Sequence, residues 1–488
     1  PLWEALEKDC LGAGTGCDAL VIPHNSNLGA GLKWPDPVDR ADARRRQLRE
    51  PLVEIFQHKG SSECRFDRIA GLGVGTVDEL CTFEQDPRDR QGPWPRPGIP
   101  DYPRRNMVRE ALKDGLAFEQ QLGTNPFRLG FVGSTDTHNG TPGNTAERGW
   151  PGHQGYADAD AERLLGIEAF DTHRVRFNPG GLAVAWAEEN SRDALFAAFA
   201  RRETYATSGT RPVLRFFAGE LPDLRCGDAD FVERAYRGGT PMGGELGPVL
   251  GNRSPRFAVL AAKDPGTASA PGTDLQRIQI VKGWVDADGV THERVFDVAG
   301  RATNGASVDP GSCRTVGTGA RELCAVWQDP AFDADQHAFY YARAVENPAC
   351  RWSTLACKSE GVDPFAPDCA ARAAVRGGAF ADCCLDESND PFLSPIVQER
   401  AWSSPIWYRP DGIAAVRGGV RFAGPGRDVL DLAVQLKSFA ATADPAAWGL
   451  TLRLTDDDEI FALAFPAGAL EKDAHGCFVL PDAAGRPG

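Results

Sequence analysis

The chain has 488 residues, of which 42% are hydrophobic and 25% charged, a composition typical of a globular protein long enough for two to four domains. It contains no run of about 18 apolar residues, which excludes a transmembrane helix. Its net charge is −15 and its one block of basic residues is the short Arg44-Arg45-Arg46, so neither nucleic acid nor an anionic membrane is expected as a partner.

Cysteine usage indicates the compartment. The chain has 13 cysteines, five of which cluster between residues 350 and 384, and they lack the Cys-x-x-Cys spacing typical of a structural zinc site. We therefore expect disulfides and a periplasmic or extracellular location, with the pairing left open. Because the sequence opens on Pro1 and not on methionine, we also expect it to be a piece of a longer protein.

The first two hundred residues alternate between predicted strands, loops and helices. Short apolar runs predict strands, and apolar residues at helical spacing predict helices. Ser191 is expected to cap the last of these helices. In chain order we expect a helix over 2–10, strands over 18–22 and 52–56 on either side of a helix over 40–50, a surface excursion over 71–103, a helix over 104–122, strands over 129–133 and 164–170, a helix over 191–199 and a strand over 213–217.

The second half is richer in predicted strands. Strands separated by turns predict a β-sandwich-like insertion over residues 211–334. A helix is expected over 335–346, at the start of a cysteine-rich segment that returns to the first domain by residue 410. Short strands then predict a separate C-terminal β accessory domain, 411–488. The expected fold class is α/β, with residues 1–210 forming the domain whose strand ends display polar side chains.

Carboxylates and imidazoles gather where three of the predicted strands end. Such side chains suit zinc, manganese or iron, and carboxylates can bridge two ions. Each residue also has a structural interpretation: His24 as a turn histidine, Glu54 as the partner of a buried arginine, and His58 as a solvent-facing side chain. Taken as a set, however, the residues favour a site for divalent metal ions, whose predicted ligands are His24, Glu54, His58, Asp136 and His138.

Seven stretches carry a resemblance to a known family. Together and in this order they resemble the bacterial domain-of-unknown-function family 3604, which is similar to the PHP superfamily, named for polymerase and histidinol phosphatase. The resemblance extends to about Tyr408. The stretches are IPHNSN (22–27), PLVEIFQHKGSSEC (51–64), GSTDTHNG (133–140), YATSGTRP (205–212), IQIVKGWVD (278–286), ENPACRWS (346–353) and QERAWSSPIWY (398–408).

The resemblance implies a fold, an activity and a set of ligands. PHP proteins fold as a distorted α/β barrel, bind up to three metal ions and commonly hydrolyse phosphoesters. The resemblance maps His24 to a single histidine ligand and Asp136 with His138 to the closing Asp-x-His pair, while Glu54 and His58 correspond less closely. The opening His-x-His motif of PHP domains does not occur in this sequence. We therefore expect a partial PHP-like barrel and weak metal binding by this chain, with activity in the full-length parent.

The expected reaction is metal-dependent hydrolysis of a small-molecule or ester substrate, most simply a phosphoester, by a metal-activated water. Competing hypotheses are an extracellular protein that binds glycans or a partner on a degenerate scaffold, and a hydrolase of amides or sulfate esters. The sequence leaves the oligomeric state and the substrate open. Besides the ligands, we expect catalytic roles for Lys59, Glu63 and Arg211, substrate or ligand contacts from Asn25, Ser61 and Ser62, and core packing for Cys64.

Overall fold

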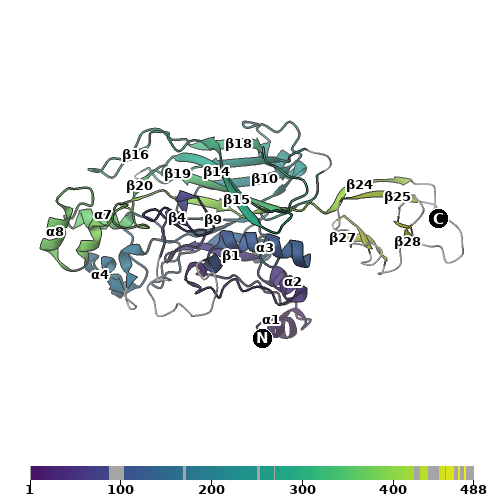
Figure 1. Ribbon diagram of the computed structural model, residues 1–488, viewed down its shortest axis with the longest axis horizontal. Coiled ribbons are helices and arrows are strands. Elements are labelled where there is room, and N and C mark those ends of the chain that lie inside the picture. Colours follow the sequence, from purple (N-terminus) through teal and green to yellow (C-terminus); the bar gives the residue numbers. More distant parts are fainter. Residues whose placement is uncertain are drawn as a thin grey trace. The chain divides into compact units, whose positions relative to one another are not determined.

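The structure is a computed structural model that describes residues 2–86, 104–168, 172–249, 253–268, 270–421, 429–437, 450–456, 458–465, 471–472 and 478–479. Its contacts divide the chain into two compact units. One consists of Pro1–Leu246 with Asn252–Arg409, and the other of Gly247–Gly251 with Pro410–Gly488. The first unit contains both helices and sheets (Figure 1), which confirms the predicted α/β class.

Three sheets organise the first unit. The smallest has the order β2-β1-β5, in which β1 and β5 run parallel. A four-stranded sheet has the order β11-β10-β13-β18, and an eight-stranded sheet has the order β12-β23-β19-β22-β9-β8, with β14 and β15 joined to it through β19. Their strands are β1 (Leu52–Gln57), β2 (Gly60–Ser61), β5 (Gly130–Gly133), β8 (Leu182–Ala185), β9 (Thr204–Thr207), β10 (Val213–Gly219), β11 (Gly239–Pro241), β12 (Glu245–Leu246), β13 (Arg256–Ala262), β14 (Leu275–Val285), β15 (Thr291–Gly300), β18 (Glu322–Gln328), β19 (Ala338–Glu346), β22 (Arg400–Ser403) and β23 (Ile406–Tyr408).

Short two-stranded ladders decorate this framework: β3 (Phe66–Asp67) with β4 (Leu72–Gly73), β6 (Ile167–Glu168) with β7 (Thr172–His173), β16 (Ser307–Val308) with β17 (Thr315–Val316), and β20 (Ala349–Cys350) with β21 (Ile396–Val397). The helices are α1 (Leu2–Leu6), α2 (Arg40–Arg49), α3 (Val108–Leu122), α4 (Ala161–Leu165), α5 (Arg192–Ala200), α6 (Phe231–Gly238), α7 (Trp352–Ser359) and α8 (Cys369–Arg376). No helix of the described part is long and apolar enough to cross a membrane.

Local sequence explains where the helices begin and end. Asp39 accepts a hydrogen bond from the backbone N–H of Asp42 at the start of α2, and Ser191 caps α5, as predicted, through the N–H of Ala194. Helix α3 ends at Gly123, whose φ of 67° lies in the left-handed region that glycine tolerates best. The predicted helices over 40–50, 104–122 and 191–199 are thereby confirmed, with small shifts at their ends.

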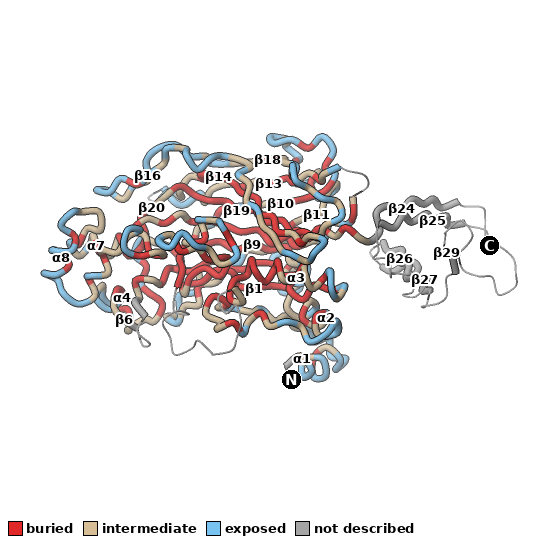
Figure 2. The backbone as a smooth tube through the Cα atoms, viewed as in Figure 1, coloured by how far each residue is buried: buried red, intermediate tan, exposed pale blue. Residues whose placement is uncertain are grey.

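The main hydrophobic core lies between α3, the parallel pair β1 and β5, and the eight-stranded sheet. It joins Val53 and Phe56 of β1, Leu112 of α3, Phe131 of β5 and Trp402 of β22, all almost fully buried. Figure 2 shows this buried centre as the red segments around β1, β9 and β19. Since α3 packs against β14 and β15, the helix holds the small parallel sheet close to the large antiparallel one.

Two predicted elements are wrong, and the predicted strand over 164–170 is confirmed only at Ile167–Glu168, because Leu164 and Leu165 end α4. Residues 18–22 form no strand, although the N–H of Val21 binds the carbonyl oxygen of Arg49. The expected helix over 335–346 is mainly the strand β19, in which every residue is buried. A strand buried on both faces loses the alternation of polar and apolar residues by which strands are recognised, so AFYYARAVE was misread as helix.

The strands of the first unit do not close into a barrel, so the predicted PHP-like barrel is not seen among the described residues. The large sheet instead joins β8 and β9, from the first 210 residues, to β14 and β19. The second unit contains the hairpins β24 (Gly412–Arg421) with β25 (Val429–Lys437), β26 (Leu450–Asp456) with β27 (Asp458–Phe465), and β28 (Glu471–Lys472) with β29 (Phe478–Val479). These described strands confirm the predicted content of short strands.

Six disulfides cross-link the first unit, as the cysteine usage predicted. They indicate an oxidising environment. Cys64, which we expected to pack in the core, is bonded to Cys81. Cys477 lies outside the described residues. The bonds are Cys10–Cys17, Cys64–Cys81, Cys226–Cys324, Cys313–Cys350, Cys357–Cys383 and Cys369–Cys384.

A buried network of charges crosses the core. Glu63 Oε1 accepts hydrogen bonds from Arg109 Nη2 at 2.6 Å and Arg343 Nη1 at 3.1 Å. Its carboxylate also accepts from Tyr341 Oη and Trp402 Nε1. Burial acts to raise the pKa of Glu63, but Arg343 and Arg109 outweigh it and lower the pKa from 4.5 to about 2. Glu63 is therefore ionised and saturated with donors.

We predict that Glu63→Gln destabilises the protein strongly, because it leaves two buried arginines short of a compensating charge. The free energy of unfolding should fall by about 3–5 kcal/mol in urea titrations at pH 7. Because the pKa of Glu63 is depressed on folding, its contribution is complete above pH 4.5 and is lost as the pH falls towards 2. The difference in the free energy of unfolding between wild type and variant should narrow over that interval. Replacing the exposed Glu220 by Gln should change the free energy of unfolding little at any pH. A variant as stable as the wild type at pH 7 would contradict this account.

Candidate functional site

The candidate site lies at the carboxyl ends of β1 and β5. These strands pair in parallel, with Leu52 opposite Gly130 and Phe56 opposite Gly133, so both chains leave the sheet at the same edge. The N–H of Ser134 then binds the carbonyl oxygen of Phe56. The backbone of Gly180 packs closely against Thr135 at this edge. Its φ is 84°, and a Cβ at this position would lie only 2.8 Å from the Cα of Thr135. The loops that follow β1 and β5 are therefore held together.

His58 lies just past β1 and is 1% exposed. Its Nδ1 lies 2.8 Å from the carbonyl oxygen of Thr135, which makes Nδ1 the protonated nitrogen and leaves the lone pair on Nε2. The buried Nε2 has no hydrogen-bond partner. Burial, together with the charge of Lys59, lowers the pKa of His58 to about 2, so the ring is neutral. A neutral imidazole with one nitrogen fixed by a carbonyl and the other available is the usual state of a metal-ligating histidine.

Glu54 is a buried carboxylate that has no cationic partner within 4 Å among the described residues. Ser134 Oγ donates to its Oε2, and the N–H of Asn25 donates to its Oε1 at 3.2 Å. Burial raises its pKa, and these neutral donors only partly oppose the rise. The predicted alternative, an ion pair with a core arginine, is wrong for this residue.

Asp136 begins the loop after β5 with a φ of 48°, a left-handed conformation that aspartate tolerates better than most residues. Its Oδ2 contacts Lys59 Nζ, accepts from Gln57 Nε2 at 3.0 Å and lies 3.8 Å from His58 Nδ1. Burial would raise the pKa of Asp136, but the hydrogen bond and charge of Lys59 lower it. Lys59 thus provides positive charge at this carboxylate.

His138 and a residue that the sequence did not single out, His153, complete the cluster. The N–H of His138 binds the carbonyl oxygen of His153 at 2.6 Å, and the His153 ring stacks on His58 with centroids 4.1 Å apart. The His138 ring lies 6.3 Å from His58 and 6.2 Å from His153. His153 is itself held by Asp158, which accepts from its N–H at 2.7 Å. No predicted strand points to this residue, so periodicity alone could not find it.

His24, predicted as a ligand, is exposed but lies beside the site. The carbonyl oxygen of Pro23 accepts from the N–H of Glu54 at 3.0 Å, and the His24 charge acts on the pKa of Glu54. Asn25, a predicted substrate residue, has a φ of 52°, donates its N–H to Glu54 and accepts a hydrogen bond from Gln57. The structure therefore brings all five predicted ligands to one edge of the small sheet.

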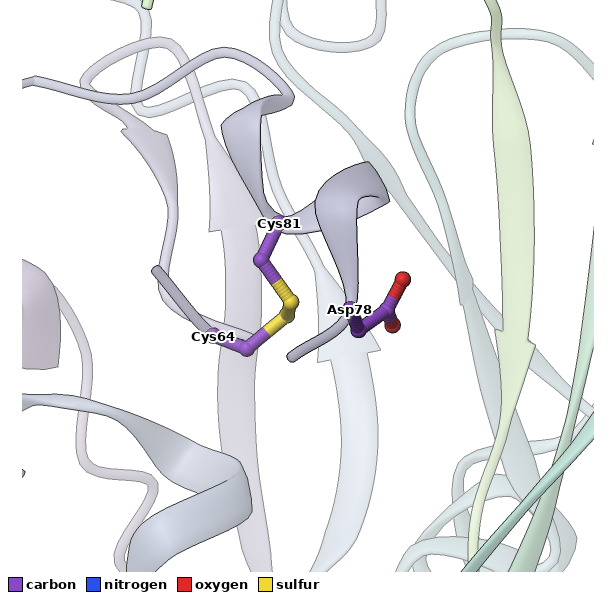
Figure 3. Close-up of side chains that lie close together, drawn as sticks. All are labelled: Cys64, Asp78 and Cys81. Atoms are coloured by element: carbon purple, nitrogen blue, oxygen red, sulfur yellow. A yellow bond between two sulfur atoms is a disulfide. The ribbon is translucent and has the colours of Figure 1, made fainter. Parts of the chain in front are cut away.

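The five do not form a closed coordination shell, since no three of them offer ligand atoms within 4.8 Å of one another. Among the described residues, only Cys64, Asp78 and Cys81 meet that distance. Figure 3 shows that the two cysteines are joined in a disulfide, and Asp78 pairs with Arg109 and Arg343. That second group cannot hold a metal ion. At the strand-end cluster, by contrast, Asp136 and the histidines would have to converge by side-chain rotation to share an ion.

Four other predicted residues lie outside the cluster. Ser62 exchanges hydrogen bonds with Asn27, and Ser61 Oγ accepts from the N–H of Glu63, so both hydroxyls shape the turn after β1. Glu63 belongs to the core network described above. Arg211 is exposed and donates to the carbonyl oxygen of Gly143 in the loop after His138. Glu63, Ser61 and Ser62 therefore do not join the strand-end cluster, and we propose no catalytic or substrate role for them.

The aromatic residues that could have formed a sugar-stacking surface are core residues. Trp352, Trp402, Trp407 and Tyr408 are each at most 2% exposed. They pack in the core and offer no platform for a glycan.

Comparison with known proteins gives a family and no function. No curated protein matches the chain, and no solved structure matches it. One family model does match, over residues 1–381, which is most of the chain. The chain belongs to the family described as "Protein of unknown function (DUF3604)", in agreement with the resemblance carried by its motifs.

Proposed function

We propose that the strand-end cluster binds divalent metal ions, zinc, manganese or iron, and that the protein is a metal-dependent hydrolase acting on phosphoesters. Two buried groups carry the proposal: among the described residues, Nε2 of His58 has no hydrogen-bond partner and the carboxylate of Glu54 has no cation in contact. Both are costly to bury as they stand. A cation beside them would remove both costs at once.

The donor chemistry fits such an ion. Imidazole nitrogens from His24, His58 and His138 and carboxylates from Glu54 and Asp136 form a mixed set that suits first-row transition metals. The choice of phosphoesters rests on the expected relationship of the family to the PHP superfamily, which the motifs alone suggest. The bound metal would supply a hydroxide near neutral pH and polarise the oxygen of the bond under attack.

Residues around the metal would orient its ligands and balance charge on the substrate. Thr135 fixes the orientation of the His58 ring, and Gln57 orients Asp136. Lys59 carries a positive charge at the cluster and would balance negative charge that develops on the substrate. Arg211, which donates to the carbonyl oxygen of Gly143 in the loop that follows His138, would meet a substrate anion as it enters. The disulfides support a periplasmic or extracellular site of action.

We predict that His58→Ala and Asp136→Asn weaken binding of Zn²⁺ or Mn²⁺ by about 10-fold or more, because each removes a donor. Isothermal titration of the metal-stripped protein measures the affinity. Hydrolysis of a chromogenic phosphomonoester and a phosphodiester should be lost in a chelator and restored by added metal.

The matched control is His292→Ala, since His292 pairs with Asp286 away from the cluster. It should bind metal as the wild type does. The proposal fails if the wild type takes up no metal, or if both site variants bind metal and hydrolyse the ester normally.

His153 gives a second prediction. Because its ring packs on His58, His153→Ala should weaken metal binding by about 10-fold. His153→Phe keeps the ring stacking and should recover most of the affinity. Titration of both folded variants, checked by circular dichroism, separates the outcomes. If the phenylalanine variant is as weak as the alanine variant, His153 acts through its nitrogen and not by positioning its neighbours.

A further inference from the structure

A polar cavity lies at β21 and β22, apart from the strand-end cluster. Its volume is about 240 Å³, and none of the residues that line it belongs to the strand-end cluster. This is smaller than the roughly 300–1,000 Å³ of pockets for drug-sized ligands, so its ligand is small. Apolar walls come from Phe83, Phe392, Ile396 and Val397, and two arginines, Arg68 and Arg400, also line it.

Arg400 is the unusual group in this cavity. It is 2% exposed, yet it forms no ion pair with a carboxylate among the described residues. Its Nη1 donates to the carbonyl oxygen of Leu80 at 3.1 Å and its Nε to that of Gln398 at 3.3 Å. The guanidinium stacks on Phe83, with Cζ 3.8 Å from the ring centroid. Backbone dipoles and one aromatic face hold the ion in place without neutralising it.

The remaining charges of the cavity are already balanced. Glu84 is bound by Arg351 through two hydrogen bonds of 2.7 Å each. At the rim, Arg68 Nη1 lies 3.8 Å from Glu387, and its Nε donates to the carbonyl oxygen of Pro391. Burial and the nearby Arg343 lower the pKa of Arg400 to about 9, which leaves it protonated at neutral pH. The carboxylates of Glu63, Asp78 and Glu399 act on Arg400 from a distance and raise its pKa, but among the described residues none of them forms an ion pair with it. A buried guanidinium without a carboxylate in contact therefore lines the cavity.

We propose that this cavity binds a small organic monocarboxylate, whose carboxylate pairs with Arg400 and whose apolar body lies against Phe392, Ile396 and Val397. A planar guanidinium matches a carboxylate in geometry. One available positive charge suits a monoanion better than a phosphate dianion. The apolar walls add affinity for a hydrocarbon body, which inorganic anions lack.

Isothermal titration of the full chain with acetate, isobutyrate and benzoate tests this assignment, with benzamide and inorganic phosphate as comparison ligands. We expect at least one monocarboxylate to bind with 1:1 stoichiometry and more tightly than acetate. Benzamide and phosphate should bind at least tenfold more weakly than that ligand.

Two variants locate the binding. Arg400→Gln removes the charge, and Ile396→Trp fills the cavity from a half-buried position while Arg400 remains; each should weaken binding at least tenfold. The control is Arg294→Gln, an exposed arginine that also lies over a phenylalanine ring, Phe296, and it should bind as the wild type does.

Three results would overturn the assignment: no binding by any of the three carboxylates, equal binding of phosphate or benzamide, or unchanged binding in folded Ile396→Trp. The last variant keeps the test decisive if Arg400→Gln does not fold. Metal binding at the strand-end cluster is measured separately, so either proposal can fail alone.

Discussion

The buried pairing of Glu63 and Asp78 with Arg109 and Arg343 is the constraint on which the first unit depends. Two negative and two positive side chains, all at most 6% exposed, share their hydrogen bonds in the middle of the core. Burying these charges is tolerable only because each is paired with a charge of opposite sign; Arg109 also pairs with Glu293, which Lys113 pairs with in turn. The network joins the turn after β1 to α3 and to β19, three segments far apart in the sequence, and so fixes how the small parallel sheet meets the large antiparallel one.

This constraint also positions the candidate site. Glu63 follows His58 by five residues, so the loop that carries His58 and Lys59 is tied at one end to β1 and at the other to the charge network. The turn between them is further held by Ser62 and Asn27. A histidine whose ring must meet a carbonyl oxygen, Thr135 O, needs such a rigid support.

Local features could be predicted from the sequence. Prediction failed where the role of a residue depends on contacts with residues far away in the chain. Alternating or short apolar runs located β1, β5, β10 and β13, and Ser191 marked the start of α5, because these signals lie within a few residues. The strand ends at Glu54, His58 and Asp136 were found for the same reason. His153 was missed because its role comes from stacking on a ring 95 positions earlier in the chain. Glu63 was misassigned because its partners, Arg109 and Arg343, lie 46 and 280 positions away. β19 was misread because full burial on both faces hides its period.

Glu54 and Glu63 show most directly why one buried carboxylate suggests a ligand site and the other does not. Both are nearly inaccessible to solvent, and burial alone would raise the pKa of each. Two arginines reverse that effect at Glu63, whereas Glu54 has only a hydroxyl, an amide and a backbone N–H, and its pKa stays raised. Desolvation of a charge has to be offset somewhere, and no described residue places a cation in contact with Glu54. The same reasoning with the opposite sign applies to Arg400, a buried cation that no described carboxylate contacts. In both places a ligand of opposite sign is the simplest way to provide a counter-charge in direct contact.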